Sequence, residues 1–388
     1  MDFELSENQV AIRDLAQRVC ARFRDDFWLE ADEKAAFPHA FHRAVAEAGL
    51  LGIAMPEALG GAGLGISEAA ILMRAVAESG AGMAGASSIH MNIFGLQPVV
   101  VFGTEEQKRR MLPPLIRGDE KACFAVTEPD AGLNTTEIKT RAERRGDRYV
   151  ISGQKIWIST AQVADRALIL ARTIPLDRVE KKTDGLSLFY TKLERSKVEI
   201  RTIRKMGRHA VDSNMLFLDG LEVSEADRIG PEGAGFKMIL HGLNPERILV
   251  GAEAVGLGMA AIRRAAAYAR ERIVFGRPIG QNQGIQHPLA RAWMNLEAAH
   301  LMVMKAAVLY DAGKECGAEA NSAKFLAAEA AFTACETAIQ THGGMGYSAE
   351  YHVERYMREC FVPRLAPVSP QMIMNFIAEK VLDLPRSY

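Results

Sequence analysis

The chain has few cysteines and no excess of either charge. Its 388 residues contain five cysteines that lie far apart, without a CxxC pair: Cys20, Cys123, Cys316, Cys335 and Cys360. Their scatter and odd number argue against a disulfide framework and against a thiolate zinc site. The 47 basic and 48 acidic side chains leave a formal charge of -1. This balance excludes a general electrostatic attraction to nucleic acid or to an anionic membrane.

Long apolar runs are also absent. No uninterrupted apolar segment is long enough to cross a bilayer, and the opening residues 1–14 carry charges throughout. We therefore expect a soluble, cytoplasmic protein with no membrane partner. His39 and His42 stand three residues apart, but no third metal ligand lies nearby, so we expect no metal site. With 48% hydrophobic residues the chain can bury a large core, and its length favours two or three domains.

Helical periodicity dominates the first part of the chain. Between residues 5 and 117 the apolar residues recur at helical spacing. Ser6 and Gln9 have the spacing of a capping box at the first helix. The segment 56–63 is too rich in glycine to be helical, and we expect Ser67 to cap the helix that follows it.

The periodicity changes twice further along. After Lys121 it becomes two, and strands are predicted at 148–152, 166–171, 186–193, 198–203 and 214–218, spaced as in a small β-barrel or sandwich. From Phe236 the helical period returns in long segments typical of an antiparallel bundle: 236–273, 285–313, 318–340, 349–360 and 369–383. The predicted fold class is therefore α+β, with an all-helical domain (1–119), a middle β-barrel domain (120–232) and a C-terminal helical bundle (233–388).

Residues 123–160 are the segment with the most chemical character. An apolar β-prone run ends in a turn at 128–132, and two further strands lead back to Trp157. Thr127 and Ser159 then place hydroxyl groups at two strand ends. Together the two strand ends form a flat surface with polar edges, which we call the wall. It suits a planar heteroaromatic cofactor, because hydroxyl and backbone groups can bond the cofactor rim while Trp157 covers its ring. Taken alone, the pattern is more often an ordinary hairpin whose Trp belongs to the core.

Seven motifs, in order and spacing, turn this pattern into a resemblance. They read PEALGGAGLG (56–65), TEPDAG (127–132), GQKIWIS (153–159), KMGRHAVDS (205–213), RIGPEGAGF (228–236), ERIVFGRPIGQNQ (271–283) and IQTHGGMGY (339–347). Over essentially its whole length, the chain resembles the acyl-CoA dehydrogenase family of flavoproteins. The resemblance implies FAD as cofactor, an acyl-CoA thioester as substrate, electron-transfer flavoprotein as electron acceptor, and a role in fatty acid metabolism.

The resemblance also assigns cofactor-binding residues. Those implied for the flavin rim and its opposite edge are Phe124, Val126, Thr127, Trp157 and Ser159, and those for the remainder of FAD are Arg272, Phe275, Gln283, Gly343, Gly344, Ser369 and Gln371. Arg272 would bind the diphosphate, for which a guanidinium fork is suited. The two glycines would approach the FAD of a neighbouring subunit, which implies a homodimer or homotetramer. A glycine stop after a helix explains the same motif equally well.

The position of the catalytic base departs from the usual family pattern. Most members carry the glutamate where this chain has Pro367, and no carboxylate lies between Cys360 and Ala378. Isovaleryl-CoA and long-chain acyl-CoA dehydrogenases place it on the helix after the β-domain, which makes Glu246 the predicted base. Asn244 and Arg247 are then predicted to contact substrate.

A proline affects the backbone next to the predicted base, at Pro245, and at the position where most members carry the base, at Pro367. Pro245 predicts a helix that either kinks there or begins there with Asn244 as its cap. Pro367 has no backbone NH to polarise the thioester oxygen, a role that the resemblance assigns to this position together with a ribityl hydroxyl of FAD. Leu133 is also predicted to contact substrate, although the family usually has a serine near the CoA arm at its position. Val368, where the family has glycine, is a further departure.

Two alternatives remain open at this stage, another reaction on the same fold and a protein without turnover. The same fold could reduce an enoyl-CoA, react with oxygen as an oxidase, or hydroxylate a small molecule as a monooxygenase. A flavin- or CoA-binding protein without turnover is also compatible with Pro367.

Overall fold

The computed structural model describes residues 4–387 and begins with a group of short helices. These are α1 (Glu7–Cys20), α2 (Asp25–Glu33), α3 (His39–Glu47), α4 (Ile66–Val76), α5 (Gly82–His90), α6 (Gln97–Phe102) and α7 (Glu105–Ile116). The predicted capping box is confirmed, because Gln9 N donates to Ser6 Oγ (3.3 Å) and Ser6 N donates to Gln9 Oε1 (3.1 Å).

The predicted cap of α4 is wrong. Ser67 lies inside that helix, which begins one residue earlier at Ile66. The first backbone NH groups instead donate to the carboxylate of Asp311, from Ile66 N to Oδ1 (2.7 Å) and from Ser67 N to Oδ2 (2.9 Å). A carboxylate favours the positive end of the helix dipole, so a distant side chain replaces the local cap.

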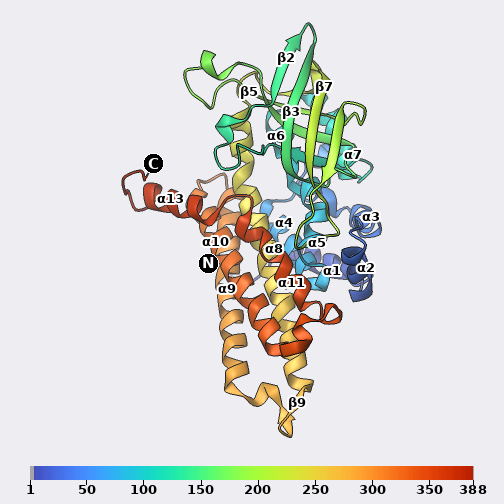
Figure 1. Ribbon diagram of the computed structural model, residues 1–388, viewed down its shortest axis with the longest axis vertical. Coiled ribbons are helices and arrows are strands. Elements are labelled where there is room, and N and C mark those ends of the chain that lie inside the picture. Colours follow the sequence, from blue (N-terminus) through green and yellow to red (C-terminus); the bar gives the residue numbers. More distant parts are fainter. Residues whose placement is uncertain (1–3, 388) are drawn as a thin grey trace.

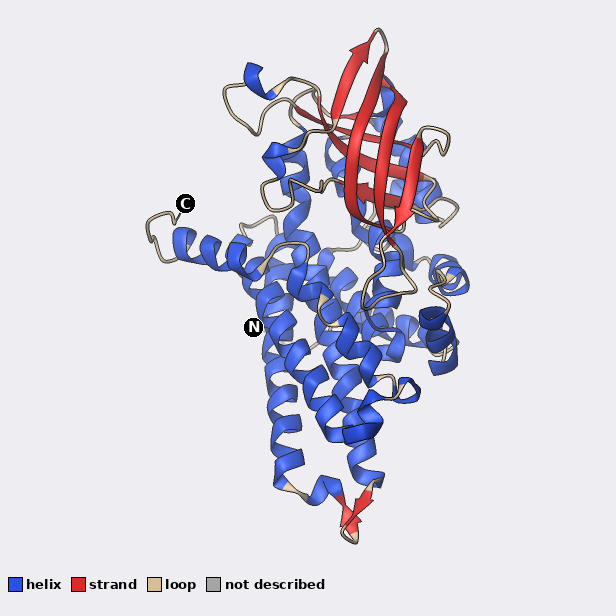
Figure 2. Ribbon diagram, viewed as in Figure 1, coloured by secondary structure: helices blue, strands red, loops and turns tan. Residues whose placement is uncertain are grey.

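The middle of the chain is a single eight-stranded sheet. Its strands are β1 (Ala122–Ala125), β2 (Arg141–Arg145), β3 (Arg148–Ser159), β4 (Arg166–Arg172), β5 (Leu186–Lys192), β6 (Val198–Thr202), β7 (Ser213–Ser224) and β8 (Arg228–Ile229). They pair in the order β6-β7-β3-β2-β4-β5-β8, and β1 lies parallel to β4. The sheet stands at one end of the molecule, above the helices (Figures 1 and 2).

Long helices make up the last part. They are α8 (Gly235–Glu271), α9 (Gln283–Asp311), α10 (Gly317–His342), α11 (Val353–Glu359), α12 (Val362–Leu365) and α13 (Pro370–Lys380), with a small hairpin of β9 (Ile273–Val274) and β10 (Arg277–Pro278) between α8 and α9. The predicted sheet between helical regions is thus confirmed. Because α8 continues through Pro245, the alternative in which a helix begins at that residue, capped by Asn244, is wrong.

The helix α8 connects the two ends of the molecule. Its 37 residues span about 55 Å at 1.5 Å per residue. It starts beside the sheet and ends at the β9–β10 hairpin, at the opposite end of the bundle (Figure 1). One hydrophobic core joins α8, α9 and α10 to the N-terminal helices through residues such as Leu72, Ile248 and Val303. None of the helices in residues 4–387 is long and apolar enough to cross a membrane.

Of the histidine pair considered for a metal, His42 is buried and His39 is exposed. His42 Nε2 lies 3.2 Å from Asn92 Oδ1, and residues 4–387 contain no group of three or more His, Cys, Asp or Glu side chains suited to a metal. Burial lowers the pKa of His42 to about 4, so this imidazole is neutral at physiological pH.

Candidate active site

The end of β3 turns Trp157 outward. The register between β3 and β7 shifts between Lys155 and Ile158, and Trp157 has a φ of 62° and a 57% exposed side chain. A bulge of this kind re-aims a side chain at the edge of a sheet. Trp157 is therefore not a core residue, and its ring is available to cover a ligand. Ile156 N donates to Thr127 O (2.9 Å), which holds Thr127 beside it.

A buried lysine fixes this pair of strand ends. Lys155 Nζ donates to Val126 O (3.0 Å), Leu170 O (2.7 Å) and Glu128 Oε1 (2.9 Å). Glu128 also accepts from Thr140 N (3.0 Å). Burial lowers the pKa of Lys155 to about 8, although Glu128 opposes this shift. Sequence analysis missed Lys155, yet it falls on the inward side of the alternation in β3 with Tyr149 and Ile151 buried.

A second cation lies where the sheet meets the helices. Arg208 precedes β7, and its guanidinium donates to Ser159 Oγ (2.9 Å), Ser213 Oγ (3.2 Å) and Ser87 Oγ (3.0 Å). Its partners within residues 4–387 are neutral hydroxyl groups, and burial lowers the pKa of Arg208. Because Ser159 accepts from Arg208, its own hydroxyl hydrogen remains available to a ligand. Sequence analysis did not single out Arg208 within the 205–213 motif.

The predicted base lies on α8, in the protein interior. Glu246 is partly buried, and burial raises the pKa of this carboxyl, while the positive charges of His90 and Arg247 oppose the shift and Glu253 adds to it. Arg247 Nη1 donates to Asn244 Oδ1 (3.0 Å). The predicted base and the two predicted substrate contacts, Asn244 and Arg247, thus lie together on one turn of α8.

A histidine and a glutamate accompany the base, and sequence analysis missed both. His90 Nδ1 lies 2.7 Å from Glu253 Oε1, and the two side chains are 14% and 2% exposed. Burial lowers the pKa of His90, but Glu253 and Glu246 outweigh it and the net pKa is raised. Glu253 follows Glu246 by two helical turns and so shares its face of α8. The seven-residue spacing from Glu246 was the sequence signal that could have identified Glu253. No such signal existed for His90, because it lies on a different helix, α5.

The loop that carries Pro367 is held by α10. Lys324 Nζ donates to Val368 O (2.7 Å), and burial lowers the pKa of Lys324 to about 8. Ser369 Oγ accepts from Met372 N (3.3 Å) and caps α13, while Gln371 is exposed. The hydroxyl oxygen of Ser369, predicted to bind cofactor, thus accepts a bond within the chain, while its hydrogen remains available to a ligand.

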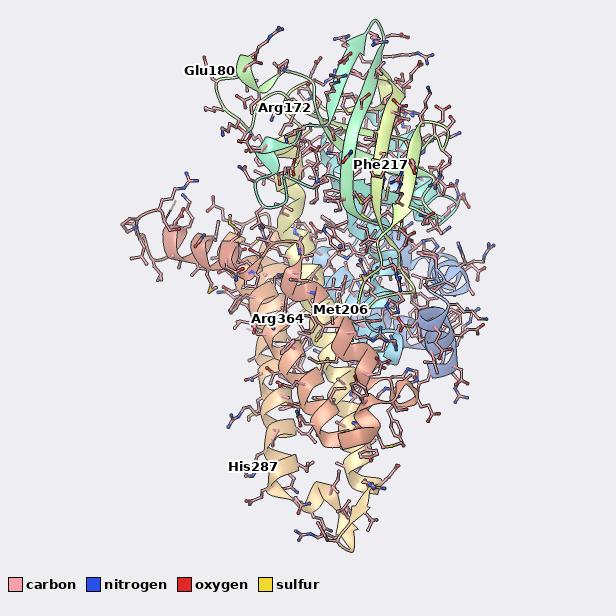
Figure 3. All side chains as sticks on the ribbon, viewed as in Figure 1. Arg172, Glu180, Met206, Phe217, His287 and Arg364 are labelled. Atoms are coloured by element: carbon pink, nitrogen blue, oxygen red, sulfur yellow. The ribbon has the colours of Figure 1, made fainter. Side chains whose placement is uncertain are left out.

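The other predicted cofactor residues lie far from Trp157. They are Arg272, Phe275, Gln283, Gly343 and Gly344, all exposed. Glu246 and Arg272 are separated by about 26 helical positions, or about 39 Å. Stacking of Tyr268 on His342, with ring centroids 4.4 Å apart, keeps Gly343 near the end of α8. His287, one turn after Gln283, lies at the far end of the bundle from Phe217 on β7 (Figure 3). One chain therefore does not bring the two groups together.

Two cavities flank α8. One of about 590 Å³ is lined by Lys181, Thr183, Asp184, Lys237 and Leu240 beside the start of α8. Leu133, predicted to contact substrate, is 62% exposed on the loop after β1.

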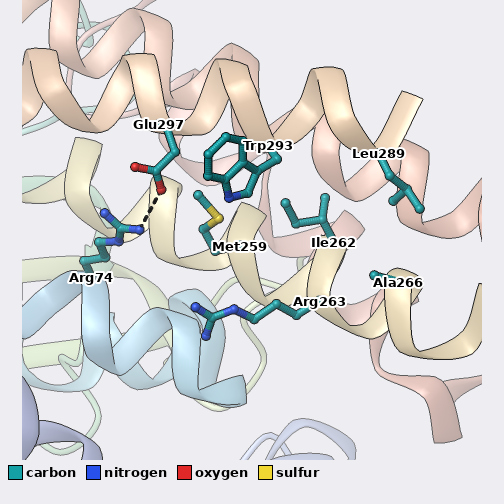
Figure 4. Close-up of a pocket in the computed structure, with 8 residues that line it drawn as sticks. All are labelled: Arg74, Met259, Ile262, Arg263, Ala266, Leu289, Trp293 and Glu297. Atoms are coloured by element: carbon teal, nitrogen blue, oxygen red, sulfur yellow. Dashed lines mark hydrogen bonds and ion pairs between the residues drawn. The ribbon is translucent and has the colours of Figure 1, made fainter. Parts of the chain in front are cut away.

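The other cavity, of about 270 Å³, lies between α4, α8 and α9 (Figure 4). Arg74 Nη2 and Glu297 Oε1 form an ion pair (3.1 Å) at its edge, and Met259 and Trp293 contribute apolar lining. It contains none of the predicted site residues, so it is not the catalytic pocket of a single chain.

The residues at the sheet end fit a flavin. Trp157 offers an exposed ring face. The hydroxyl of Thr127 is uncommitted within the described part of the chain, since it is the backbone carbonyl of this residue that accepts from Ile156 N. Ser159 has a free hydroxyl hydrogen beside a cation. The planar ring of Trp157 suits the face of a heteroaromatic ring system. The hydroxyl donors and the positive charge suit its polar rim.

Family models and known proteins match the whole chain. The N-terminal, middle and C-terminal domain models of acyl-CoA dehydrogenase match residues 6–119, 123–221 and 233–382. Acyl-CoA dehydrogenase FadE12 of Mycobacterium tuberculosis is 36% identical, over 99% of this chain and 98% of its own length. Acryloyl-CoA reductase (NADH) of Anaerotignum propionicum is 35% identical, over 98% of this chain and 96% of its own.

Solved structures agree. Butyryl-CoA dehydrogenase of Megasphaera elsdenii superposes with a TM-score of 0.93 at 28% identity, covering 98% of this chain and 100% of that one. The FAD complex of PigA superposes with a TM-score of 0.92 at 25% identity, covering 98% and 99%. The chain therefore belongs to the acyl-CoA dehydrogenase family, whose members bind FAD and are flavin-dependent oxidoreductases acting on CH–CH bonds.

Proposed function

We propose that this chain dehydrogenates an acyl-CoA thioester between Cα and Cβ, with Glu246 as the base. The observation that carries the proposal is the position of this carboxylate. It is partly buried in a cluster with His90 and Glu253, and Arg208, which acts electrostatically on His90, bonds Ser159 at the flavin wall. The loop at Pro367 carries no carboxylate that could compete.

The proton chemistry follows from this environment. A carboxylate can remove the α-proton only when it is ionised, and a base raised toward neutral pKa accepts a proton more readily than an ordinary glutamate. Bound FAD supplies the acceptor for the hydride that leaves Cβ. Thr127, Trp157 and Ser159 would hold the flavin ring, with Phe124 and Val126 contributing backbone at its rim.

The remaining cofactor residues support a site shared by two subunits. One FAD molecule does not span the roughly 39 Å between Glu246 and Arg272, so we propose that Arg272, Phe275, Gln283, Gly343 and Gly344 reach the FAD of a second copy. The assembly would be a homodimer or a homotetramer. Exposed apolar side chains on α9 support further burial: Trp293, Met294, Leu301 and Val308.

The CoA arm would approach along the start of α8. Lys237 lines the larger cavity, and Asn244 follows it by two turns on the same face. A lysine at the mouth suits the phosphates of CoA. Asn244 and Arg247 would then contact the arm next to Glu246, with Leu133 at its edge.

The cellular setting is proposed on the same basis. The electron acceptor would be electron-transfer flavoprotein, in a cytoplasmic pathway of fatty acid metabolism. Pro367 offers no NH to the thioester oxygen, so another donor must replace it, or the rate falls by about tenfold to a thousandfold.

A reductase is the second candidate, favoured by the 35% identity to acryloyl-CoA reductase. Dehydrogenation of an acyl-CoA and reduction of an enoyl-CoA are opposite directions of a reaction at the same pair of carbon atoms. Purified holoenzyme is mixed under nitrogen with a panel of acyl-CoA thioesters and then exposed to air. Bleaching of the flavin that persists in air is expected. Loss of the bleaching on admitting air indicates an oxidase, and no bleaching with any thioester rejects the proposal.

A further inference from the structure

The acyl tail would lie beyond Glu246, on the side away from the CoA cavity. Lys237 and Leu240 line that cavity near the start of α8. Glu246 follows Lys237 by about 14 Å along the helix, and Glu253 lies about 10 Å further, on the same face as Glu246. If the thioester is at Glu246 and its arm runs toward Lys237, the acyl carbons past Cβ point toward Glu253.

That region is charged rather than apolar. His90 and Glu253 form a close contact of 2.7 Å with almost no exposure. Arg208 supplies a second cation that acts on both, while Glu246 supplies a second carboxylate. The groups facing His90 are thus Glu253 and Glu246 from α8 and Arg208 from the segment before β7. With His90 protonated, its charge and that of Arg208 face the carboxylates of Glu253 and Glu246. Arg247 also acts on Glu246, and the carboxylates of Glu359 and Asp212 also act on Arg208.

The remaining ring nitrogen of His90 is the key atom. Nδ1 is engaged by Glu253, whereas Nε2 has no hydrogen-bond partner within residues 4–387, and it is not among the buried polar atoms that are sealed off without one. With Nδ1 bonded to a carboxylate, a protonated ring offers Nε2–H as a donor. An alkyl tail would remove water from this donor without replacing the bond, which is unfavourable.

We propose that the acyl group of the substrate carries a neutral hydrogen-bond acceptor, a hydroxyl or a carbonyl, a few carbons beyond Cβ, and that His90 Nε2 binds it. This inference rests on the proposed function, because it requires an acyl thioester at Glu246. A carboxylate substituent is disfavoured, since it would place a third negative charge beside the carboxylates of Glu246 and Glu253. His90 and Glu253 thus determine specificity.

The test compares acyl-CoA thioesters of equal chain length. Pairs of hexanoyl-CoA with 5-hydroxyhexanoyl-CoA and with 5-oxohexanoyl-CoA, and one dicarboxylic analogue, are assayed with holoenzyme for kcat/KM. A hydrogen bond to a charged donor predicts a preference of roughly 10- to 150-fold for the neutral polar member. Equal kcat/KM within the pairs, or a preference for the dicarboxylic thioester, overturns the inference. Neither result affects the dehydrogenase proposal, which fails only when no thioester reduces the flavin.

Variants separate recognition from folding. In His90→Leu/Glu253→Leu both charges are replaced by apolar groups, so neither partner is left buried and alone. The preference should disappear or reverse toward hexanoyl-CoA, and the affinity for the polar enoyl-CoA product, measured calorimetrically, should fall by a similar factor. His42→Gln, a buried histidine outside the cluster, should keep the preference. An unchanged preference in the double variant overturns the assignment of His90.

Discussion

The two ends of α8 differ in how their polar groups are satisfied. At the sheet end, Lys155 and His90 have partners within the chain. At the far end, Arg272 and Gln283 are exposed, and the Phe275 side chain is fully in solvent. The sheet end is a preorganised wall, whereas the far end is a set of groups whose ligand must come from outside. The difference teaches why the proposed site is shared, since the far end has exposed groups that one chain does not bring to the sheet end.

Removing the base tests the sheet end most severely. In Glu246→Gln the amide cannot accept the α-proton, so we expect turnover to fall by about 10²- to 10⁴-fold while FAD remains bound. Stopped-flow reduction of the flavin by acyl-CoA measures this. Glu47→Gln, an exposed glutamate at the end of α3, serves as control. Full activity in Glu246→Gln would show that the base is elsewhere.

Removing the buried ion pair between Lys155 and Glu128 should lower the stability of the fold and not only the activity. Lys155→Met leaves Glu128 buried without its cation, and we expect the free energy of unfolding to fall by about 3 to 5 kcal/mol. Urea denaturation of the apoprotein measures it. Lys192→Met, on an exposed position of β5, is the matched control. Adding Glu128→Leu to Lys155→Met should recover part of the loss, and a further drop would contradict this account.

The far end should matter for FAD in the partner subunit. Arg272→Ala is expected to weaken FAD binding by about 10- to 100-fold without changing the unfolding midpoint of the apoprotein. Mixed dimers of Arg272→Ala with Glu246→Gln sharpen the comparison. One of their two sites combines the intact Glu246 of one subunit with the intact Arg272 of the other. Recovery of activity in the mixture is expected. Additive loss without recovery would place both residues in a site within one chain.

The smallest effect concerns pH. Burial raises the pKa of Glu246, and only the deprotonated form is a base, so kcat/KM should fall as pH decreases through that raised value. His90 and Arg247 oppose the shift, and Glu253 adds to it. His90→Gln removes a positive charge, so the acidic limb should move to higher pH, as followed by initial rates. His42→Gln should leave it in place. A shift to lower pH would contradict the arrangement.

Periodicity predicted the order of helices and sheet, and the long helices agree within a few residues. It failed where partners are distant in sequence. Asp311, 245 residues after Ile66, replaces the expected serine cap of α4. Pro245 is itself buried within α8, so tertiary packing outweighs its local preference.

The site was predictable only in part, for the same reason. Motifs identified Thr127, Trp157 and Glu246, whose chemistry is visible locally. They did not reveal His90, which meets Glu253 from 163 positions away. Nor did they reveal Arg208, whose role depends on hydroxyl groups from three other segments.

The β9–β10 hairpin has a practical consequence. Phe275 forms its tip with a φ of 50°, next to Gly276, and presents an entire aromatic ring to water. An isolated chain would tend to self-associate there, and a chain paired with its partner would hide the ring against bound nucleotide. If the FAD of the partner subunit covers this ring, as proposed above, removing FAD at a fixed protein concentration should promote clouding of the solution. Added FAD should then act as a solubilising agent for this protein.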